Sequence, residues 1–107
     1  MSNLVNFIQI DETTNTIAGN IATLTFDIDI IGEAFTSDNP KAPVFRLFAM
    51  TPRNRRIEVG GIWKKQNRQD QDYYSLSVNT GHGRINANLG RYPGQDDDTL
   101  MAVIPWD

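Results

Sequence analysis

The sequence has no cysteine, no long apolar run, and no lysine or arginine among its first forty residues. The absence of cysteine excludes disulfides, thiolate zinc sites, iron–sulfur clusters and a cysteine nucleophile, and it is typical of a reducing compartment. No run of about 18 apolar residues is present, so the sequence predicts no transmembrane helix. The first residues also lack the basic and apolar segments of a secretory signal. We therefore expect a cytoplasmic protein without a membrane span.

The charges that are present are segregated along the chain. Residues 1–40 carry six acids, whereas residues 41–68 carry eight cations and one acid, a local balance of +7. From residue 69 onward the balance returns to −4, and the net charge of the whole chain is −3. A fold can gather a cationic segment on one surface and focus a field there. The charge pattern therefore favours a binding role and says little about chemistry.

Residues 20–31 show the clearest hydrophobic pattern. Apolar residues from Ala22 to Ile30 alternate with polar ones, which predicts a single half-buried β-strand. Alternation or short apolar runs predict six more strands, at residues 4–10, 44–50, 56–65, 73–78, 84–89 and 99–104. Clusters of Asp, Asn, Gly, Pro and Gln separate these strands, as expected for turns.

About seven strands without a helix longer than a turn or two predict one all-β domain over residues 1–107. We expect a single antiparallel meander, and the pattern leaves open whether it closes into a small barrel or folds into a sandwich. Gly60 and Gly61 lie within a predicted strand and indicate a bulge or a close approach of the backbone. Arg46 is flanked by apolar residues, so we expect it to pair with an acid such as Asp27, Asp29 or Asp72, because an unpaired buried guanidinium group would be costly. The predicted core consists of residues on the apolar strand faces, namely Leu24, Phe26, Trp63, Tyr74, Leu76 and Ile85.

Several short segments resemble a known family. They are Gly19-Asn20-Ile21-Ala22-Thr23-Leu24, Ala42-Pro43-Val44-Phe45-Arg46, Glu58-Val59-Gly60-Gly61-Ile62-Trp63-Lys64-Lys65, Asp72-Tyr73-Tyr74-Ser75-Leu76 and Ile85-Asn86-Ala87-Asn88-Leu89. Together they are similar to the bacterial domain-of-unknown-function family seven hundred and thirty-six. Proteins of that family are often encoded on conjugative and integrative elements, so the resemblance implies a mobile-element setting and no particular activity. The arginine-rich turn 51–56 and the acidic loop 92–98 depart from the family pattern, so a role for either depends on this sequence alone.

The sequence gives little support for catalysis. His82 is the single histidine, and no nucleophile motif surrounds Ser75 or Ser77, which precede it. The acids at 96–98 are adjacent, whereas calcium loops place their ligands at alternate positions. The short Gly81-His82-Gly83 segment lacks the Lys-Ser/Thr of a phosphate loop. We therefore expect a protein that is not an enzyme and that holds no metal and no cofactor.

The meander predicts where the cations lie in space. A hairpin of residues 44–50 and 56–65 has an arginine-rich tip, and the turn at 79–84 returns to the same end of the molecule. The arginine pole predicted in this way has four members, Arg53, Arg55, Arg56 and Arg84. We expect Asp11 and Glu12 to oppose it. A second charged surface is predicted at the other end, with Lys64, Lys65, Arg68, Asp96, Asp97 and Asp98.

A planar guanidinium group with five donors suits phosphate and carboxylate partners. We therefore expect a binding module that acts on nucleic acid or on a nucleoprotein complex, although binders of nucleic acid are usually basic overall. The negative net charge favours an alternative, an anti-defence inhibitor of the anti-CRISPR type that binds a host effector protein by charge complementarity. A further alternative is a structural accessory protein that forms a homodimer through an exposed strand edge.

Overall fold

The computed structural model describes residues 5–39, 41–79, 81, 83–94, 96–97 and 99–105. It contains eight β-strands: β1 (Phe7–Asp11), β2 (Thr16–Ala22), β3 (Asp27–Ala34), β4 (Phe45–Met50), β5 (Arg56–Gln66), β6 (Asp72–Asn79), β7 (Arg84–Arg91) and β8 (Leu100–Pro105). No helix long and apolar enough to cross a membrane occurs in these residues.

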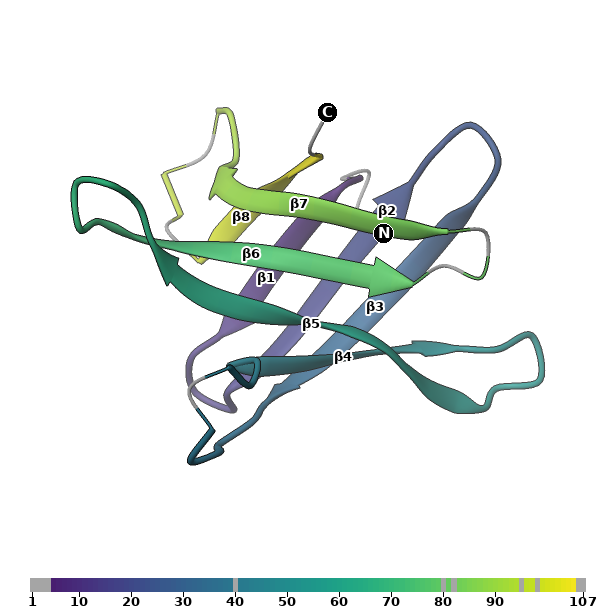
Figure 1. Cartoon of the computed structure of the whole chain (residues 1–107). Helices are drawn as coiled ribbons and strands as arrows, with labels where there is room; N and C mark the ends of the chain where they lie inside the picture. The colour runs from purple at the N-terminus through teal and green to yellow at the C-terminus, as the bar shows by residue number, and fades with distance from the viewer. Residues whose placement is uncertain are drawn as a thin grey trace.

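The strands form a closed antiparallel barrel (Figure 1). Each strand pairs with the next along the chain, and β1 pairs with β8 to complete the circle. The all-β meander is therefore confirmed, and of the two architectures left open by the sequence the barrel is correct. Closure matters because it covers the edges of the first and last strands, which would otherwise be exposed.

The eighth strand arises because residues 20–31 form two strands rather than one. β2 ends at Ala22 and β3 begins at Asp27, with a tight turn in which the Thr23 amide donates to the carbonyl of Phe26 at 2.7 Å. The Thr23 hydroxyl also accepts hydrogen bonds from the amides of Thr25 and Phe26. A threonine can supply such local bonds in a turn without Gly, Pro or Asn, so the sequence lacked the usual signal.

The additional strand changes which turns share an end of the barrel. The β2–β3, β4–β5 and β6–β7 turns lie at one end, and the β1–β2, β3–β4, β5–β6 and β7–β8 connections lie at the other. We call these the arginine end and the far end. Asp11 ends β1 and Glu12 follows it, so both acids lie at the far end. The prediction that they oppose the arginines is wrong.

The barrel interior is filled by inward-facing aliphatic side chains. Its most completely buried members are Ile8, Ile21, Ile30, Leu47, Ile62, Leu76 and Val78. Of the predicted core, Leu76 is fully buried, and Phe26, Tyr74 and Ile85 pack against the core while partly buried. Leu24 is fully exposed because it lies in the β2–β3 turn, so its assignment to the core is wrong.

The assignment of Trp63 to the core is wrong, and a β-bulge in β5 explains why. Gly60 pairs with Leu47 and Glu58 pairs with Phe48, so the pairing shifts by one residue at Val59. The bulge indicated by the glycine pair is thus confirmed. Its consequence is that Ile62 faces the core whereas Trp63 lies on the outer face, half-buried, with its indole Nε1 donating to the carbonyl of Lys41 at 3.0 Å.

Candidate functional site

The β4–β5 hairpin projects beyond the rest of the barrel at the arginine end. On the β3 side, pairing ends at Ile31 with Phe48, and on the β6 side it ends at Gly60 with Val78. Beyond these pairs, β4 and β5 pair with no other strand in the described part of the chain and remain bonded to each other, through Ala49 with Ile57 and neighbouring pairs. Residues 49–57 therefore form a free two-stranded ribbon, which we call the arginine arm. Figure 1 shows it in teal, extending past the end of β6.

The tip of the arginine arm is held by a compact network around Thr51. The Thr51 amide donates to the carbonyl of Arg55 at 2.8 Å, and the Asn54 amide donates to the carbonyl of Thr51 at 2.8 Å. The Thr51 hydroxyl accepts from the amides of Arg53 and Arg55. Asn54 has a φ of 61°, a left-handed conformation that asparagine adopts more readily than most residues. The tip is thus held by hydrogen bonds within the hairpin itself.

Two of the four predicted arginines lie at this tip. Arg53 and Arg55 are exposed, and neither forms an ion pair with any residue that the structure describes. Their guanidinium groups are therefore available to an external anion. The arginine arm contains no acid, and the nearest one in β5 is Glu58 at the base of the arm.

The other two predicted arginines are at the same end but are engaged within the protein. Arg56 begins β5, and its Nη2 lies 3.0 Å from Oε1 of Glu33. Arg84 begins β7 on a different part of the barrel wall and donates from Nη1 to Oγ of Ser77 at 2.9 Å. Among the described residues, the arginine pole therefore consists of two guanidinium groups without an ion-pair partner, on Arg53 and Arg55, and two that have partners, on Arg56 and Arg84.

The base of the arginine arm is braced on the outer face of the barrel. Phe48 points outward yet is only 8% exposed, because the guanidinium carbon of Arg56 lies 3.7 Å and that of Arg46 5.6 Å from its ring centroid. Arg46 also forms two hydrogen bonds with Glu58, at 2.6 and 2.9 Å. Cation–π and bidentate contacts of this kind fix the orientation of both strands. Side-chain contacts therefore link β4 and β5 at the base of the arm, in addition to the β4–β5 ladder.

The Arg46–Glu58 pair also shifts the titration of both groups. The hydrogen bond with Glu58 raises the pKa of Arg46, and the same bond lowers the pKa of Glu58. The expectation that Arg46 pairs with an acid is confirmed, but the partner is Glu58 and none of the three acids named from the sequence. Asp27 and Asp29 accept hydrogen bonds from Asn20, and Asp72 pairs with Lys64.

The second predicted surface lies at the far end and is largely engaged in local contacts. Lys64 pairs with Asp72 at 3.3 Å, and Asp96 pairs with Arg91 at 3.3 Å. Asp97 accepts hydrogen bonds from the hydroxyl and amide of Thr99, which lower the pKa of Asp97. Lys65 and Arg68 are exposed in the same region, and Asp98 lies outside the described residues.

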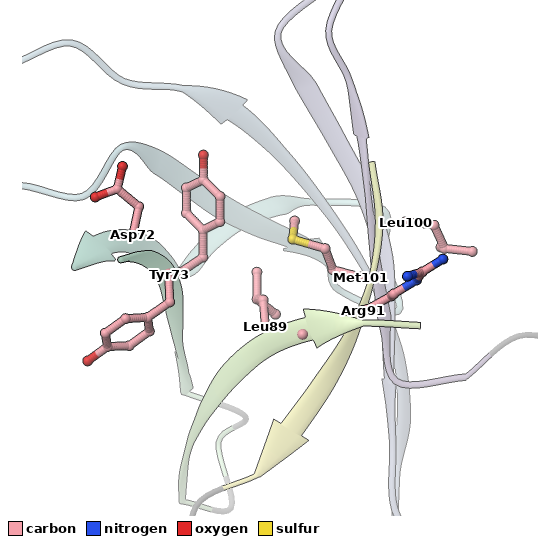
Figure 2. Close-up of a pocket in the computed structure, with 8 residues that line it drawn as sticks. Asp72, Tyr73, Leu89, Arg91, Leu100 and Met101 are labelled. Atoms are coloured by element: carbon pink, nitrogen blue, oxygen red, sulfur yellow. The ribbon is translucent and has the colours of Figure 1, made fainter. Parts of the chain in front are cut away.

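A shallow pocket lies at the far end between β6, β7 and β8 (Figure 2). Leu89 and Met101 lie between the Asp72 side and the Arg91 side of this pocket. Its volume of about 260 Å³ is below the range of roughly 300–1,000 Å³ typical of small-molecule sites. Because Asp72 and Arg91 already have ion-pair partners, the pocket is a weaker candidate than the arginine arm.

The described residues contain no cluster of three or more His, Asp or Glu side chains that could hold a metal ion. His82, the residue around which a catalytic triad would have to be built, lies outside the described residues.

Sequence reasoning missed the apolar side chains beside the arginines. Met50 and Ile57 are half-exposed on the arginine arm, and Leu24 is exposed in the turn at the same end. Met50 and Ile57 belong to predicted strands, so their exposure could have been found only by knowing that neighbouring strands stop short of the arm. The length of each strand is set by register, which a period-two pattern does not encode.

A family model for proteins of unknown function, DUF736, matches residues 6–106. The chain belongs to the DUF736 family. No curated protein and no solved structure matches the chain. Membership of DUF736 confirms the resemblance seen in the short motifs and supplies no activity, so function is argued from the geometry of the arginine arm.

Proposed function

We propose that this DUF736 protein is a non-enzymatic binding module that contacts double-stranded DNA through the arginine arm. The observation that carries the proposal is the free two-stranded ribbon with unpaired Arg53 and Arg55 at its tip. Arginine binds phosphate through a planar fork of donors, and contacts to phosphates supply most of the affinity of non-specific DNA binding.

The shape of the arm supports a duplex rather than a single strand. The major groove of B-DNA is about 8.5 Å deep and admits a two-stranded β-ribbon. The arm extends beyond Phe48 as far as Thr51, which is about 10 Å at 3.3 Å per residue. Binding of unpaired bases relies on exposed aromatic side chains. Trp63 and Tyr73 lie on β5 and β6 toward the far end, so they do not combine with the arginine tip.

The charge of the whole protein sets an upper limit on this affinity. The net charge is −3, and Asp27 and Asp29 lie on β3 beside the base of the arm. Few phosphates can be neutralised by two free guanidinium groups. We expect a dissociation constant on the order of 10⁻⁵ M or weaker at physiological salt, and tighter binding at low salt.

Fluorescence anisotropy with labelled single- and double-stranded oligonucleotides tests the proposal. The double variant Arg53→Ala/Arg55→Ala should lose most duplex binding at low salt. Lys64→Ala/Lys65→Ala is the matched control, since it removes the same charge at the far end. Loss of binding in both variants to the same extent would show that net charge, and not the arm, is responsible. Absence of binding by the wild-type protein at low salt rejects the proposal.

A second candidate is a protein target, such as the host effector of an anti-defence inhibitor. It is favoured by exposed Leu24, Met50 and Ile57 at the arginine end, because exposed apolar groups beside charged ones are typical of protein interfaces. Affinity capture from a bacterial lysate with and without nuclease separates the two. A protein partner survives the nuclease, whereas an association through DNA does not.

The setting that we propose for either activity is the cytoplasm of a bacterium that carries a conjugative or integrative element. The family membership and the lack of cysteine support this setting. The homodimeric accessory protein is a third candidate, and sedimentation of the purified chain over a concentration series tests it.

A further inference from the structure

The barrel opens between β3 and the arginine arm. The β3–β4 register covers only four pairs, from Ile31 with Phe48 to Ala34 with Phe45. β3 starts four residues earlier, at Asp27, and β4 continues to Met50. Figure 1 shows β3 and β4 diverging toward the end that carries the teal hairpin. A groove of about 260 Å³ lies between the diverging strands and is lined by Asp27, Ile28, Asp29, Ile31, Ala49 and Met50.

The backbone of β3 presents hydrogen-bonding groups to this groove. Just before β3, the Phe26 carbonyl accepts from the Thr23 amide, and at the end of β3 the Ala34 amide donates to the Asn15 carbonyl. The even-numbered positions at both ends of β3 therefore bond toward β2. Because bonding direction alternates along an antiparallel strand, Ile28 and Ile30 also bond toward β2. The amides and carbonyls of Asp27 and Asp29 therefore point toward β4. In the described part of the chain they have no strand beside them.

The side chains of the groove carry a second, matching pattern. Asp27 and Asp29 lie on the outer face, where Oδ1 of each accepts from Nδ2 of Asn20, at 2.6 and 3.2 Å. Neither carboxylate forms an ion pair within the described residues. Ile28 lies between the two aspartates and Ala49 lies across the groove. Both face inward and pack with the barrel core. The groove is thus acidic outside and apolar inside.

We propose that this groove binds an extended segment of a partner protein in which basic and apolar residues alternate. Such a segment adds a strand to β3 by β-augmentation, a recurring mode in which main-chain bonds give affinity and alternate side chains give specificity. Residues two apart on a strand lie about 6.6 Å apart on the same face. Lysine or arginine at alternate positions then reaches Asp27 and Asp29, while the intervening apolar residues contact Ile28 and Ala49.

The same pattern argues against a second copy of this chain as the occupant. Nowhere in the sequence does an apolar residue separate two cations, so the arrangement Lys/Arg–apolar–Lys/Arg is missing. The cations of the arginine arm are instead adjacent or separated by Asn54. The occupant is therefore a different protein, and the inference is independent of DNA binding by the arm tip.

A short fluorescein-labelled peptide of alternating lysine and valine is the probe. Anisotropy at physiological ionic strength should show saturable binding at least about tenfold tighter than that of an alternating glutamate–valine peptide. A third peptide carries lysines with methylated backbone nitrogens. It keeps every charge but loses the donors that face β3, because residues directly opposite on two strands share a face. It should bind about tenfold more weakly than the unmethylated peptide.

Asp27→Asn/Asp29→Asn is the variant for the groove, because asparagine keeps the oxygen that accepts from Asn20. It should weaken the lysine–valine peptide about tenfold or more, whereas the matched control Asp11→Asn/Asp70→Asn, at the far end, should not. Amide exchange should slow at Asp27 and Asp29 on binding. Equal affinity for the methylated peptide, or no effect of the groove variant, overturns the proposal. Self-association of the free protein with protection of the same amides also overturns it, by showing a second copy in the groove.

DNA binding by the arm tip and peptide binding by the groove should be lost independently of each other. Arg53→Ala/Arg55→Ala should retain peptide affinity, and Asp27→Asn/Asp29→Asn should retain or strengthen DNA binding because two negative charges are removed. A variant that loses both DNA binding and peptide binding contradicts the assignment of two distinct sites.

Discussion

The guanidinium group of Arg56 lies over the ring of Phe48, with its carbon 3.7 Å from the ring centroid, and it reaches Glu33 on the next strand but one. This contact joins β5 across β4 to β3 on the outer surface of the barrel. It explains why an outward-facing phenylalanine is buried, and it anchors the base of the arginine arm. Without it the arm would be tied to the barrel mainly through the β4–β5 ladder and the Arg46–Glu58 pair.

Replacement of Phe48 by alanine should therefore destabilise the protein as strongly as a core substitution. We expect a loss of about 3–5 kcal/mol in the free energy of unfolding, the range for a buried aromatic side chain. Urea unfolding followed by circular dichroism measures it. Tyr73→Ala, on the outer face of β6, is the control and should cost clearly less. A loss below about 1 kcal/mol for Phe48→Ala would show that the arginines do not shield the ring.

Stability should depend on pH through Glu58. Its pKa is lowered in the folded state by the hydrogen bond from Arg46, so the pair stabilises the protein above the unfolded pKa of the carboxyl group. That contribution is lost as the pH falls through the folded pKa. Wild type should unfold at higher urea concentration than Glu58→Gln at neutral pH, and the difference should shrink in acid. A difference that stays constant between neutral pH and acid contradicts the assignment.

Gly60 should be intolerant of any side chain. A Cβ at this position would collide with the backbone carbonyl oxygen of Ser77, which cannot move without breaking the β5–β6 ladder. Gly60→Ala should cost about 3 kcal/mol or more, or prevent folding. Gly90→Ala is the matched control, because its Cβ would meet the flexible end of the Ile104 side chain rather than backbone. Thermal melts in which the two variants are equally stable would disprove the close approach.

Leu24 should be replaceable at little cost. It is fully exposed in the β2–β3 turn, so Leu24→Ser should change the free energy of unfolding by less than about 0.5 kcal/mol. Leu76→Ala, at a fully buried position, should cost about 2–5 kcal/mol. Parallel denaturant titrations of the two variants measure these losses. A large loss of stability for Leu24→Ser would contradict the β2–β3 turn and support the single strand predicted over residues 20–31.

These residues show how far a single sequence could be interpreted. The all-β meander, the hairpin with an arginine tip and the bulge at the glycine pair follow from local signals, namely alternation, turn residues and glycine inside a strand. Leu24 was misplaced because Thr23 closes its turn with a hydroxyl group. Trp63 was misplaced because alternation was continued through a bulge that the glycines had indicated.

The site itself was only half predictable. Arg53 and Arg55 could be placed because they belong to one hairpin. The partners of Arg46 and Arg56 could not, because they depend on which residues of β3, β4 and β5 lie opposite one another. The opening beside β3 has the same origin: it exists because the β3–β4 ladder ends at Ile31 and Phe48, and strand register is a long-range property.

The salt dependence of DNA binding tests the central claim most directly. Each phosphate that a cation neutralises in duplex DNA contributes about 0.9 to the slope of log affinity against log salt concentration. If Arg53 and Arg55 contact phosphates, the slope for Arg53→Ala/Arg55→Ala should be shallower than that of the wild type by about 1.8, and Lys64→Ala/Lys65→Ala should leave it unchanged. Equal slopes for the wild type and the arginine variant would contradict the assignment of the arginine arm as the DNA-binding element.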